Sequence, residues 1–254
     1  MRLRPIIGWA VFLFLGTIIV KALPSPQGTY YFFKGKQLSN SRQFEAAAEA
    51  FQQSVNSDPE FARGYMELGS TLMTLKKSDQ AETAFKKAAS LEDDSCASCG
   101  LGILYHRTGK NKEAEVALKH AIQLDPKDSC AYDELGRLYY DQEDYAKAIE
   151  AFNEKAKIKP NAVTYHFLGN STYFSGKFEE SLVFYEKAAS LNPNYADFYS
   201  DYGRAFNRVN RHKEALEIYE RGLRIEPDDV MLHVGRGFTE FGVGNDNEAM
   251  AEYK

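Results

Sequence analysis

Apolar and polar residues alternate at helical spacing in short segments along most of the chain. Leu135 and Tyr139 lie one turn apart in one such segment, and Ala148 and Phe152 lie one turn apart in the next. Turn-forming residues separate segments, as in Thr-Gly-Lys-Asn at 108–111. Because each segment has one apolar face, the pattern predicts pairs of amphipathic helices that pack against each other.

The same arrangement of residues recurs every 33 or 34 positions. Its marker is a glycine, at Gly35, Gly69, Gly102, Gly136, Gly169, Gly203 and Gly237. Twelve positions after each glycine stands a small residue, at Ala47, Ala81, Ala114, Ala148, Ser181, Ala215 and Ala249. Four positions later stands a large one, at Phe51, Phe85, Leu118, Phe152, Tyr185, Tyr219 and Tyr253. A fixed period of this length indicates a repeat architecture.

Each recurring residue has a mechanical role in a helical hairpin. A glycine opposite a small residue lets two antiparallel helices approach closely, and the large residue fills the gap that remains. Proline ends the second helix of a unit, because it lacks the amide donor and clashes with the preceding turn. The prolines stand at Pro59, Pro126, Pro160, Pro193 and Pro227, and the second unit has Asp93 in that place.

This pattern resembles the tetratricopeptide repeat family over residues 28–254. The resemblance implies an all-α fold, a right-handed superhelical solenoid of about seven antiparallel helix hairpins. The units would be 28–61, 62–94, 95–128, 129–161, 162–195, 196–229 and the partial unit 230–254. The residues that depart from the family's usual apolar or small side chains are Lys34, Ser98, Lys155, Arg236 and Glu240.

Residues 1–27 have a different character and predict a signal-anchor and a short linker. Positions 6–20 are uncharged and mostly apolar, and they follow Arg2 and Arg4. This run is longer than most cleaved signal-peptide cores and shorter than the roughly 20 residues that span a bilayer comfortably. We expect residues 6–23 to hold the chain in a membrane. A cleaved signal peptide, which would leave a secreted chain, and a buried soluble helix are the alternatives.

Under the positive-inside rule, an anchor or a signal peptide places the repeat array on the non-cytoplasmic side, periplasmic or extracellular. The anchored form would be a single-pass membrane protein. The chain as a whole carries a formal charge of −5, but residues 1–27 contain three basic residues and no acid. The remainder has 28 basic against 36 acidic residues. Nucleic-acid binding depends on clustered lysine and arginine, so this acidic body argues against a nucleic-acid partner.

No familiar catalytic pattern is present in the sequence. It contains no phosphate loop, no nucleophile elbow and no HExxH motif. Its five histidines fall on different predicted helices, without a paired acid at a telling spacing. We therefore expect no enzymatic activity, no cofactor and no metal.

In the family that the chain resembles, the first helices of the hairpins line a concave groove that grips a peptide or a partner helix. Carried over position by position, the groove residues would be Arg63, Met66, Ser70, Ile103, His106, Asp133, Arg137, Tyr140, His166, Asn170, Tyr173, Asp197, Arg204, Asn207 and Arg208, together with Phe32, Lys36, Ser200 and the three cysteines. Aromatic rings, amides and charges of both signs suit an extended peptide or a helix. The arginines either bind partner carboxylates or pair with aspartates on their own or a neighbouring helix.

Three cysteines leave at least one thiol unpaired within the chain. Cys96 and Cys99 lie on one face at the start of a predicted helix, where the helix dipole lowers a thiol pKa. A disulfide between them, a metal site with His106, and small half-buried residues without chemistry are the three interpretations. Cys130 stands one repeat after Cys96, and the roughly 8–10 Å between packed helices argues against a relaxed disulfide between these two.

We therefore expect a non-catalytic protein–protein interaction scaffold or adaptor in membrane or envelope-associated complex assembly. A substrate-recognition arm of a larger enzyme or secretion machine, truncated at residue 254, is the alternative. The last unit ends inside its second helix, although terminal repeats normally need a solvated outer face. Either the chain is a piece of a longer protein, or Phe238, Phe241 and Tyr253 are covered by a partner, by lipid or by a second copy through self-association.

Overall fold

The structure, a computed structural model, describes residues 25–245, and every regular element among them is a helix. The first helices of successive hairpins are α1 (Pro26–Asn40), α3 (Ala62–Thr74), α5 (Ser95–Arg107), α7 (Ser129–Asp141), α9 (Ala162–Phe174), α11 (Asp197–Arg208) and α13 (Val230–Gly242). The second helices are α2 (Phe44–Ser57), α4 (Ser78–Leu91), α6 (Asn111–Leu124), α8 (Tyr145–Ile158), α10 (Phe178–Leu191) and α12 (His212–Leu223). The predicted all-α class is confirmed.

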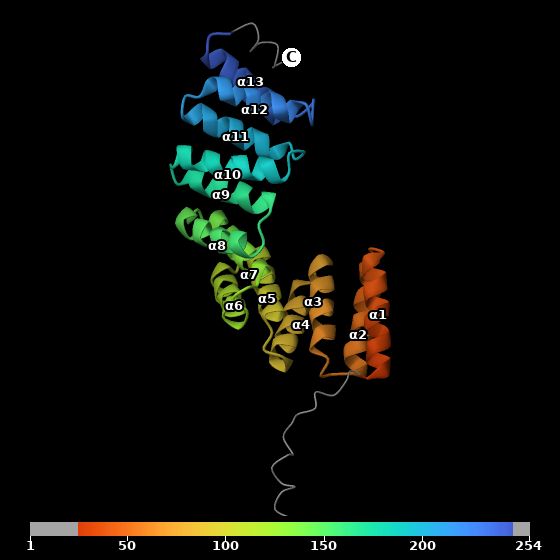
Figure 1. Cartoon of the computed structure of the whole chain (residues 1–254). Helices are drawn as coiled ribbons and strands as arrows, with labels where there is room; N and C mark the ends of the chain where they lie inside the picture. The colour runs from red at the N-terminus through yellow and green to blue at the C-terminus, as the bar shows by residue number, and fades with distance from the viewer. Residues whose placement is uncertain (1–24, 246–254) are drawn as a thin grey trace, which may run out of the picture.

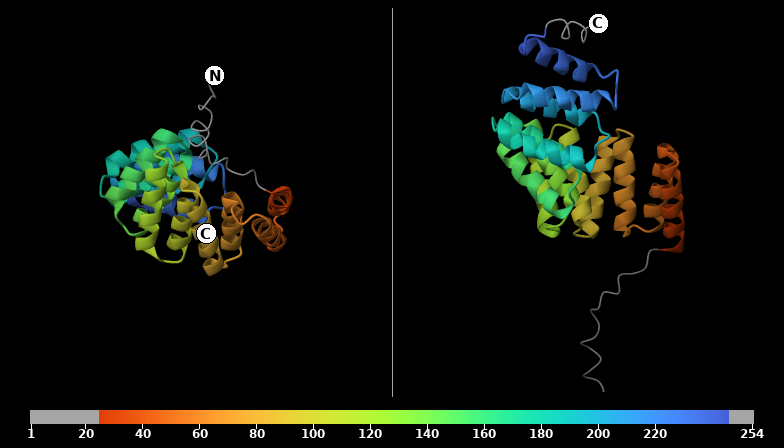
Figure 2. Two further views of the ribbon diagram at one scale, coloured as in Figure 1. Left: turned by 90° about the horizontal axis from the view of Figure 1, so that it is seen from below. Right: turned by 45° about the horizontal axis from the view of Figure 1, so that its top comes forward.

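The hairpins stack in chain order into a curved solenoid. From α1 to α12 the two helices of each hairpin pack together, and each of the second helices α2 to α12 also packs against the first helix that follows it. Helices α1 to α4 stand upright in Figure 1, whereas α9 to α13 lie across it, so the direction of the helices turns along the stack. The two views of Figure 2 show the same turning from below and from an inclined direction. The arrangement leaves one surface formed by successive first helices and another formed by successive second helices.

The contact inside each hairpin is the one that the repeat predicts. Ala148 and Phe152 of α8 are fully buried against α7. A Cβ atom added to Gly136 would lie 2.6 Å from a ring carbon of Phe152, and one added to Gly169 would lie 2.6 Å from the ring of Tyr185. No side chain fits at these positions, so the glycines let the two helices approach to the distance that the core requires.

The turn inside each hairpin also repeats. One residue in every turn has a left-handed backbone, at Arg42, Lys76, Gly109, Glu143, Gly176, Asn210 and Gly244. Glycine adopts this conformation without a steric penalty, which explains its presence at three of the seven turns. The prolines lie between hairpins, and side chains such as Asp128 and Asn161 cap the helices that follow by accepting backbone N–H bonds.

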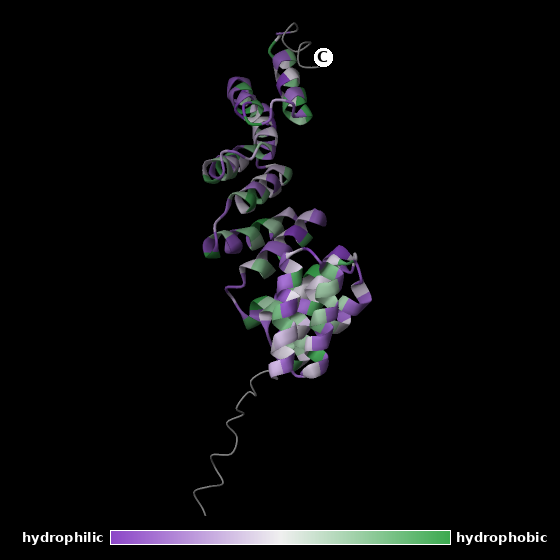
Figure 3. Cartoon of the chain, turned by 90° about the vertical axis from the view of Figure 1, so that its right-hand side faces the viewer, coloured by the Kyte–Doolittle hydropathy of each residue, from purple (hydrophilic) through white to green (hydrophobic). Residues whose placement is uncertain are grey.

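The predicted anchor at residues 6–23, and Ala249 and Tyr253 of the seventh unit, lie outside the described residues. Within 25–245, no helix combines the length and the apolar character that crossing a bilayer requires. Figure 3 shows hydrophilic and hydrophobic residues mixed along these helices, as amphipathic helices require.

The close contact at Gly136 gives a direct test of hairpin packing. The variant Gly136→Ala forces a methyl group into the Phe152 ring, so we expect the free energy of unfolding to fall by about 2 kcal/mol. Gly242→Ala is the matched control, because nothing lies within 4 Å of its added Cβ, and it is expected to be neutral or to stabilise α13 by up to about 1 kcal/mol. Urea unfolding followed by circular dichroism measures both. Equal stability of Gly136→Ala and wild type would contradict the packing described here.

Candidate partner-binding groove

The residues expected in the groove all lie on first helices, from α1 to α11. Their exposure falls into three groups. The exposed ones are Arg63, Ser70, Asp197, Arg204 and Arg208. The half-buried ones are Met66, Ile103, His106, Asp133, Arg137, Tyr140, His166, Tyr173 and Asn207, and Asn170 is buried. Between α7 and α11 most of these side chains contact residues of neighbouring helices.

A buried lysine explains one departure from the repeat pattern. Lys155 occupies a position where the family has a small residue, yet its side chain is 10% exposed and donates from Nζ to Oδ1 of Asp133 at 2.6 Å. Asp133 also accepts from Nε of Arg137 at 3.1 Å. A buried ammonium group is tolerated when an anion and hydrogen bonds compensate its lost hydration. Both contacts of the Asp133 carboxylate are therefore with residues of its own hairpin, α7 and α8.

Arg137 reaches from α7 to α9 and stacks on Phe167, with 4.4 Å between the guanidinium carbon and the ring centroid. Phe167 in turn stacks on Phe152 of the hairpin core at 5.2 Å. The guanidinium thus has an aromatic face on one side and the Asp133 carboxylate beside it, the two partners that arginine prefers. Arg137 was expected either to bind a partner carboxylate or to pair with an aspartate of the protein itself. In the structure it pairs with Asp133.

A second polar network joins α9 to α11. Nε2 of His166 lies 2.7 Å from Oδ2 of Asp201, and Arg204 pairs with the other oxygen of that carboxylate. Burial acts to raise the pKa of Asp201, but the hydrogen bond and charge of His166 outweigh it and hold the pKa below its usual range. The hydroxyl group of Tyr185 donates to Asn170 Oδ1 at 2.6 Å, and burial raises the pKa of that hydroxyl group.

Asn207 has a similar internal role one hairpin later. Its Nδ2 donates to Oγ1 of Thr239 on α13 at 2.7 Å, and its Oδ1 lies 3.1 Å from Nδ1 of His212. Asn170 and Asn207 thus link helices of the protein itself. Polar side chains in these places fix how successive hairpins sit on one another.

The ends of α7 and α9 and the starts of α8 and α10 carry a continuous group of aromatic rings, which we call the aromatic strip: Tyr140, Tyr145, Tyr173, Phe174 and Phe178. Phe174 stacks on Tyr145 at 5.5 Å and meets the edge of Tyr140 at 6.3 Å. Tyr173 contacts Phe178 at 5.1 Å. Phe174 is 46% exposed, which is unusual for a phenylalanine that contacts three other rings.

Two arginines of α11 border the aromatic strip. The guanidinium of Arg204 lies 5.4 Å from the ring centroid of Tyr173, and that of Arg208 lies 4.6 Å from that of Phe178. Arg204 is also paired with Asp201, whereas Arg208 is exposed and makes no ion pair within residues 25–245. That Arg208 is available to a partner carboxylate therefore stays a prediction. The Phe178 ring already orients its guanidinium group.

Sequence reasoning placed Tyr140 and Tyr173 in the groove but missed Phe174, Tyr145 and Phe178. Phe174 immediately follows Tyr173 at the end of the same helix, and the other two open the next helices. The signal was present in the sequence as aromatic residues on both sides of two hairpin turns. Repeat position within the first helices does not reveal this group, because a turn brings residues of both helices together.

The earlier repeats contribute less to this surface. Arg63 lies over the Phe32 ring at 5.7 Å, and Lys36 pairs with Glu67 at 2.8 Å. His106 lies 3.1 Å from the exposed carboxylate of Asp141. Met66, Ser70 and Ile103 also lie there, outside the aromatic strip. All three cysteines are free thiols, and the sulfur atom beside Cys99 belongs to Cys130 rather than to Cys96.

Open clefts also lie between successive second helices. One of about 790 Å³ is lined by α6, α7 and α8, and another of about 670 Å³ by α2, α3 and α4. None of the residues expected in the groove lines either cleft. Lysines at the first cleft pair with acids of their own helices, as Lys119 does with Glu115 at 2.6 Å. The aromatic strip, by contrast, contains two residues expected in the groove and combines the exposed ring of Phe174 with Arg208, which makes no ion pair within residues 25–245.

The lowered pKa of Asp201 makes a prediction about pH. A carboxylate whose pKa is lower in the folded chain stabilises it above the unfolded pKa, near 4, and this contribution is lost as the pH falls through the folded pKa. We expect Asp201→Asn to cost about 2 kcal/mol at pH 7 and less at pH 3.

The control for this prediction is Asp141→Asn, which removes the same kind of contact to a histidine from a side chain that is 63% exposed. Its cost should stay below about 1 kcal/mol at either pH. Urea unfolding at the two pH values measures the effect. A cost for Asp201→Asn that is the same at pH 3 and pH 7 would show that the carboxylate charge is not what stabilises this contact.

Comparison with known proteins agrees with the architecture. Models of the tetratricopeptide repeat match residues 34–95, 105–166 and 175–233. Anaphase-promoting complex subunit 6 of Arabidopsis thaliana is 25% identical over 218 residues, which are 83% of this chain and 40% of that protein. The chain thus spans less than half the length of this relative.

Two solved structures illustrate the fold. The APC/C hetero-tetramer Cut9–Hcn1 matches with a TM-score of 0.68 and 19% identity, over 84% of this chain and 42% of that chain. YrrB, described as a TPR protein with an unusual peptide-binding site, matches with a TM-score of 0.62 and 21% identity, over 73% of this chain and 96% of that chain. With repeat models matching most of its length, and with hairpins stacked as in these solenoids, the chain belongs to the tetratricopeptide repeat family.

Proposed function

We propose that the protein is an interaction scaffold whose aromatic strip, with Arg208 beside it, binds a segment of a partner protein. The observation that carries the proposal is the exposure of Phe174 within a cluster of rings that already has an arginine at its border. Aromatic residues and arginine supply most of the binding energy at protein interfaces. Peptide binding by YrrB and the complexes formed by the anaphase-promoting relatives support a role of this kind.

The chemistry of the surface narrows the partner. Rings at the strip favour an apolar or aromatic side chain that covers Phe174 and excludes water. Arg208 favours a carboxylate on the same segment, because its guanidinium can donate two parallel hydrogen bonds. Asp133 and Asp201 add little attraction for a basic partner, since both are already paired. The segment that fits is an apolar peptide or helix with an acidic residue.

Partner capture with matched variants tests the proposal. The full chain, the double variant Phe174→Ala with Arg208→Ala, and a control with Val183→Ala and Arg224→Ala are used as baits in extracts of the cells that make the protein. The control removes the same kinds of atoms from exposed positions on α10 and at the end of α12. We expect the native chain and the control to retain a common partner. The double variant at Phe174 and Arg208, the groove variant, should retain less than about a tenth of it, which is typical when two anchor residues of an interface are removed.

Circular dichroism must show that all three baits are folded, because a loss of structure would remove any partner. Retention of the same partner by the groove variant would place the interaction elsewhere, and the clefts between second helices would be the next surface to test.

Location is a separate part of the proposal. We propose that residues 6–23 hold the array at a membrane with its repeats on the non-cytoplasmic side, which the apolar run and Arg2 and Arg4 support. The full chain should then stay in the membrane pellet after alkaline extraction, and deletion of residues 1–24 should release it. Protease added from the non-cytoplasmic side should degrade the array. Full-length, uncleaved chain in the cytoplasmic soluble fraction would contradict this location.

Self-association stays a prediction. Phe238 and Phe241 of α13 are 67% and 65% exposed, which keeps a contact between two copies open. Exposed rings of this kind also suit a different partner or a further part of a longer chain.

A further inference from the structure

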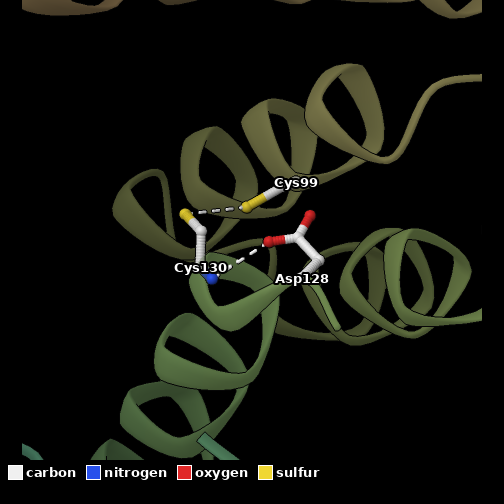
Figure 4. Close-up of side chains that lie close together, drawn as sticks. All are labelled: Cys99, Asp128 and Cys130. Atoms are coloured by element: carbon white, nitrogen blue, oxygen red, sulfur yellow. Dashed lines mark hydrogen bonds between the residues drawn. The ribbon is translucent and has the colours of Figure 1, made fainter. Parts of the chain in front are cut away.

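Two cysteines from neighbouring repeats meet at the start of α7. Cys99 lies in α5 and Cys130 in α7, and their Sγ atoms are 3.1 Å apart. Figure 4 shows the two sulfur atoms pointing toward each other, with the carboxylate of Asp128 beside Cys130. Cys99 is 3% exposed, whereas Cys130 is open to solvent. The third cysteine, Cys96, is not part of this group.

Local structure holds both thiols in place. Asp128 caps α7 and accepts from the backbone N–H groups of Cys130 and Ala131 at 3.0 and 3.1 Å, which fixes the first turn of that helix. The residue three positions before the repeat glycine of one first helix faces the residue six positions before the repeat glycine of the next. Phe32 and Arg63 occupy the same two positions in the first pair of repeats and are also in contact. Cys99 and Cys130 are thus joined by the packing of the solenoid itself.

We propose that Cys99 and Cys130 form a redox-active pair that closes into a disulfide linking the third and fourth repeats. The 3.1 Å separation of the sulfur atoms lies between the values for a disulfide and for a metal site, so the third ligand of the group decides between them. A disulfide needs them about 1 Å closer, at roughly 2.05 Å. A tetrahedral zinc ion, with bonds of about 2.3 Å, would hold two thiolates roughly 3.8 Å apart. Asp128, the only other ligand of the group, already accepts two backbone hydrogen bonds as a helix cap.

The surroundings assign a role to each thiol. Cys99 donates its S–H to the sulfur of Cys130, which lowers the pKa of Cys130, and this donation together with burial raises the pKa of Cys99. Cys130 is therefore both the more accessible and the more acidic of the two. It is the thiol that meets an oxidant from solution first.

The oxidant required is a small disulfide, such as oxidised glutathione. The Cys130 thiolate attacks one sulfur of that disulfide, forms a mixed disulfide and releases one thiol. Cys99 then loses its proton to solvent, attacks Sγ of Cys130 and expels the second small thiol. Cys99 and Cys130 together lose two electrons and two protons, and the small disulfide becomes two thiols. The product closes a loop between residues 31 positions apart and fixes α5 against α7, beside Asp133 and Arg137.

Oxidation of the full chain in a glutathione redox buffer tests the proposal. We expect the intact mass to fall by about 2 Da, the two hydrogens lost on forming one disulfide. A non-reducing tryptic digest should contain peptide 88–107 joined to peptide 128–137. The oxidised chain should melt roughly 5 to 10 °C above the reduced chain, because the link restricts the unfolded state.

Cysteine variants identify which two residues form the disulfide. Peptide 88–107 contains both Cys96 and Cys99, so Cys96→Ser, at an exposed position, must keep the link, and Cys99→Ala must lose it and carry a glutathione adduct on Cys130 instead. The digest of the wild-type chain with fragment sequencing gives the same assignment if Cys99→Ala does not fold. A link that includes Cys96, or adducts without any link, would overturn the proposal. So would one zinc ion per chain that survives desalting, blocks oxidation and is lost in Cys99→Ala.

Discussion

Two helices of a hairpin approach so closely that a glycine on one must face a large side chain on the other, and this contact recurs through the whole described stack. Gly136 against Phe152 is typical: the ring occupies the volume where a Cβ would stand. The contact fixes which face of each first helix is buried inside its hairpin. Because that face is the same in every repeat, the remaining faces of successive first helices line up and meet one another along the solenoid.

The side chains on those remaining faces determine which parts of the surface can bind a partner. Between α7 and α11 they hold charges that compensate one another, such as Asp133 with Lys155 and Asp201 with His166. These pairs link a first helix to its own second helix or to the next hairpin, so they act in the stack rather than in recognition. The recognition that we propose falls to groups whose contacts leave them able to bind a partner, such as the exposed ring of Phe174 and the guanidinium of Arg208.

The repeat spacing was sufficient to predict the helices, the contact inside each hairpin and the turns, because each depends on residues close in sequence or on steric rules that every unit shares. The partners of single polar residues were harder. Lys155 was recognised as a departure, but its compensation by Asp133 depends on where two helices of one hairpin place their side chains. Equivalent repeat positions suggested only Cys96 as a neighbour of Cys130 and argued against a disulfide between those two, whereas packing between repeats joins non-equivalent positions and brings Cys130 to Cys99.

The aromatic strip is another set of contacts that the repeat pattern does not predict. Tyr140 and Tyr173 were expected at the surface from their repeat positions, and both contribute to it. Phe174, Tyr145 and Phe178 join them only because two hairpin turns fold the ends and starts of four helices together. A one-dimensional repeat register describes each helix face correctly, but it does not reveal a surface that runs across turns.

Hydrogen exchange of the full chain, with and without a captured partner, measures most directly whether this surface is the one that binds. Amides at the ends of α7, α9 and α11 lie next to the aromatic strip and its arginines, so a partner seated there should slow their exchange while α2, α4 and α6 remain unchanged. Protection confined to second helices or to α13, with the ends of α7, α9 and α11 exchanging as before, would contradict the assignment.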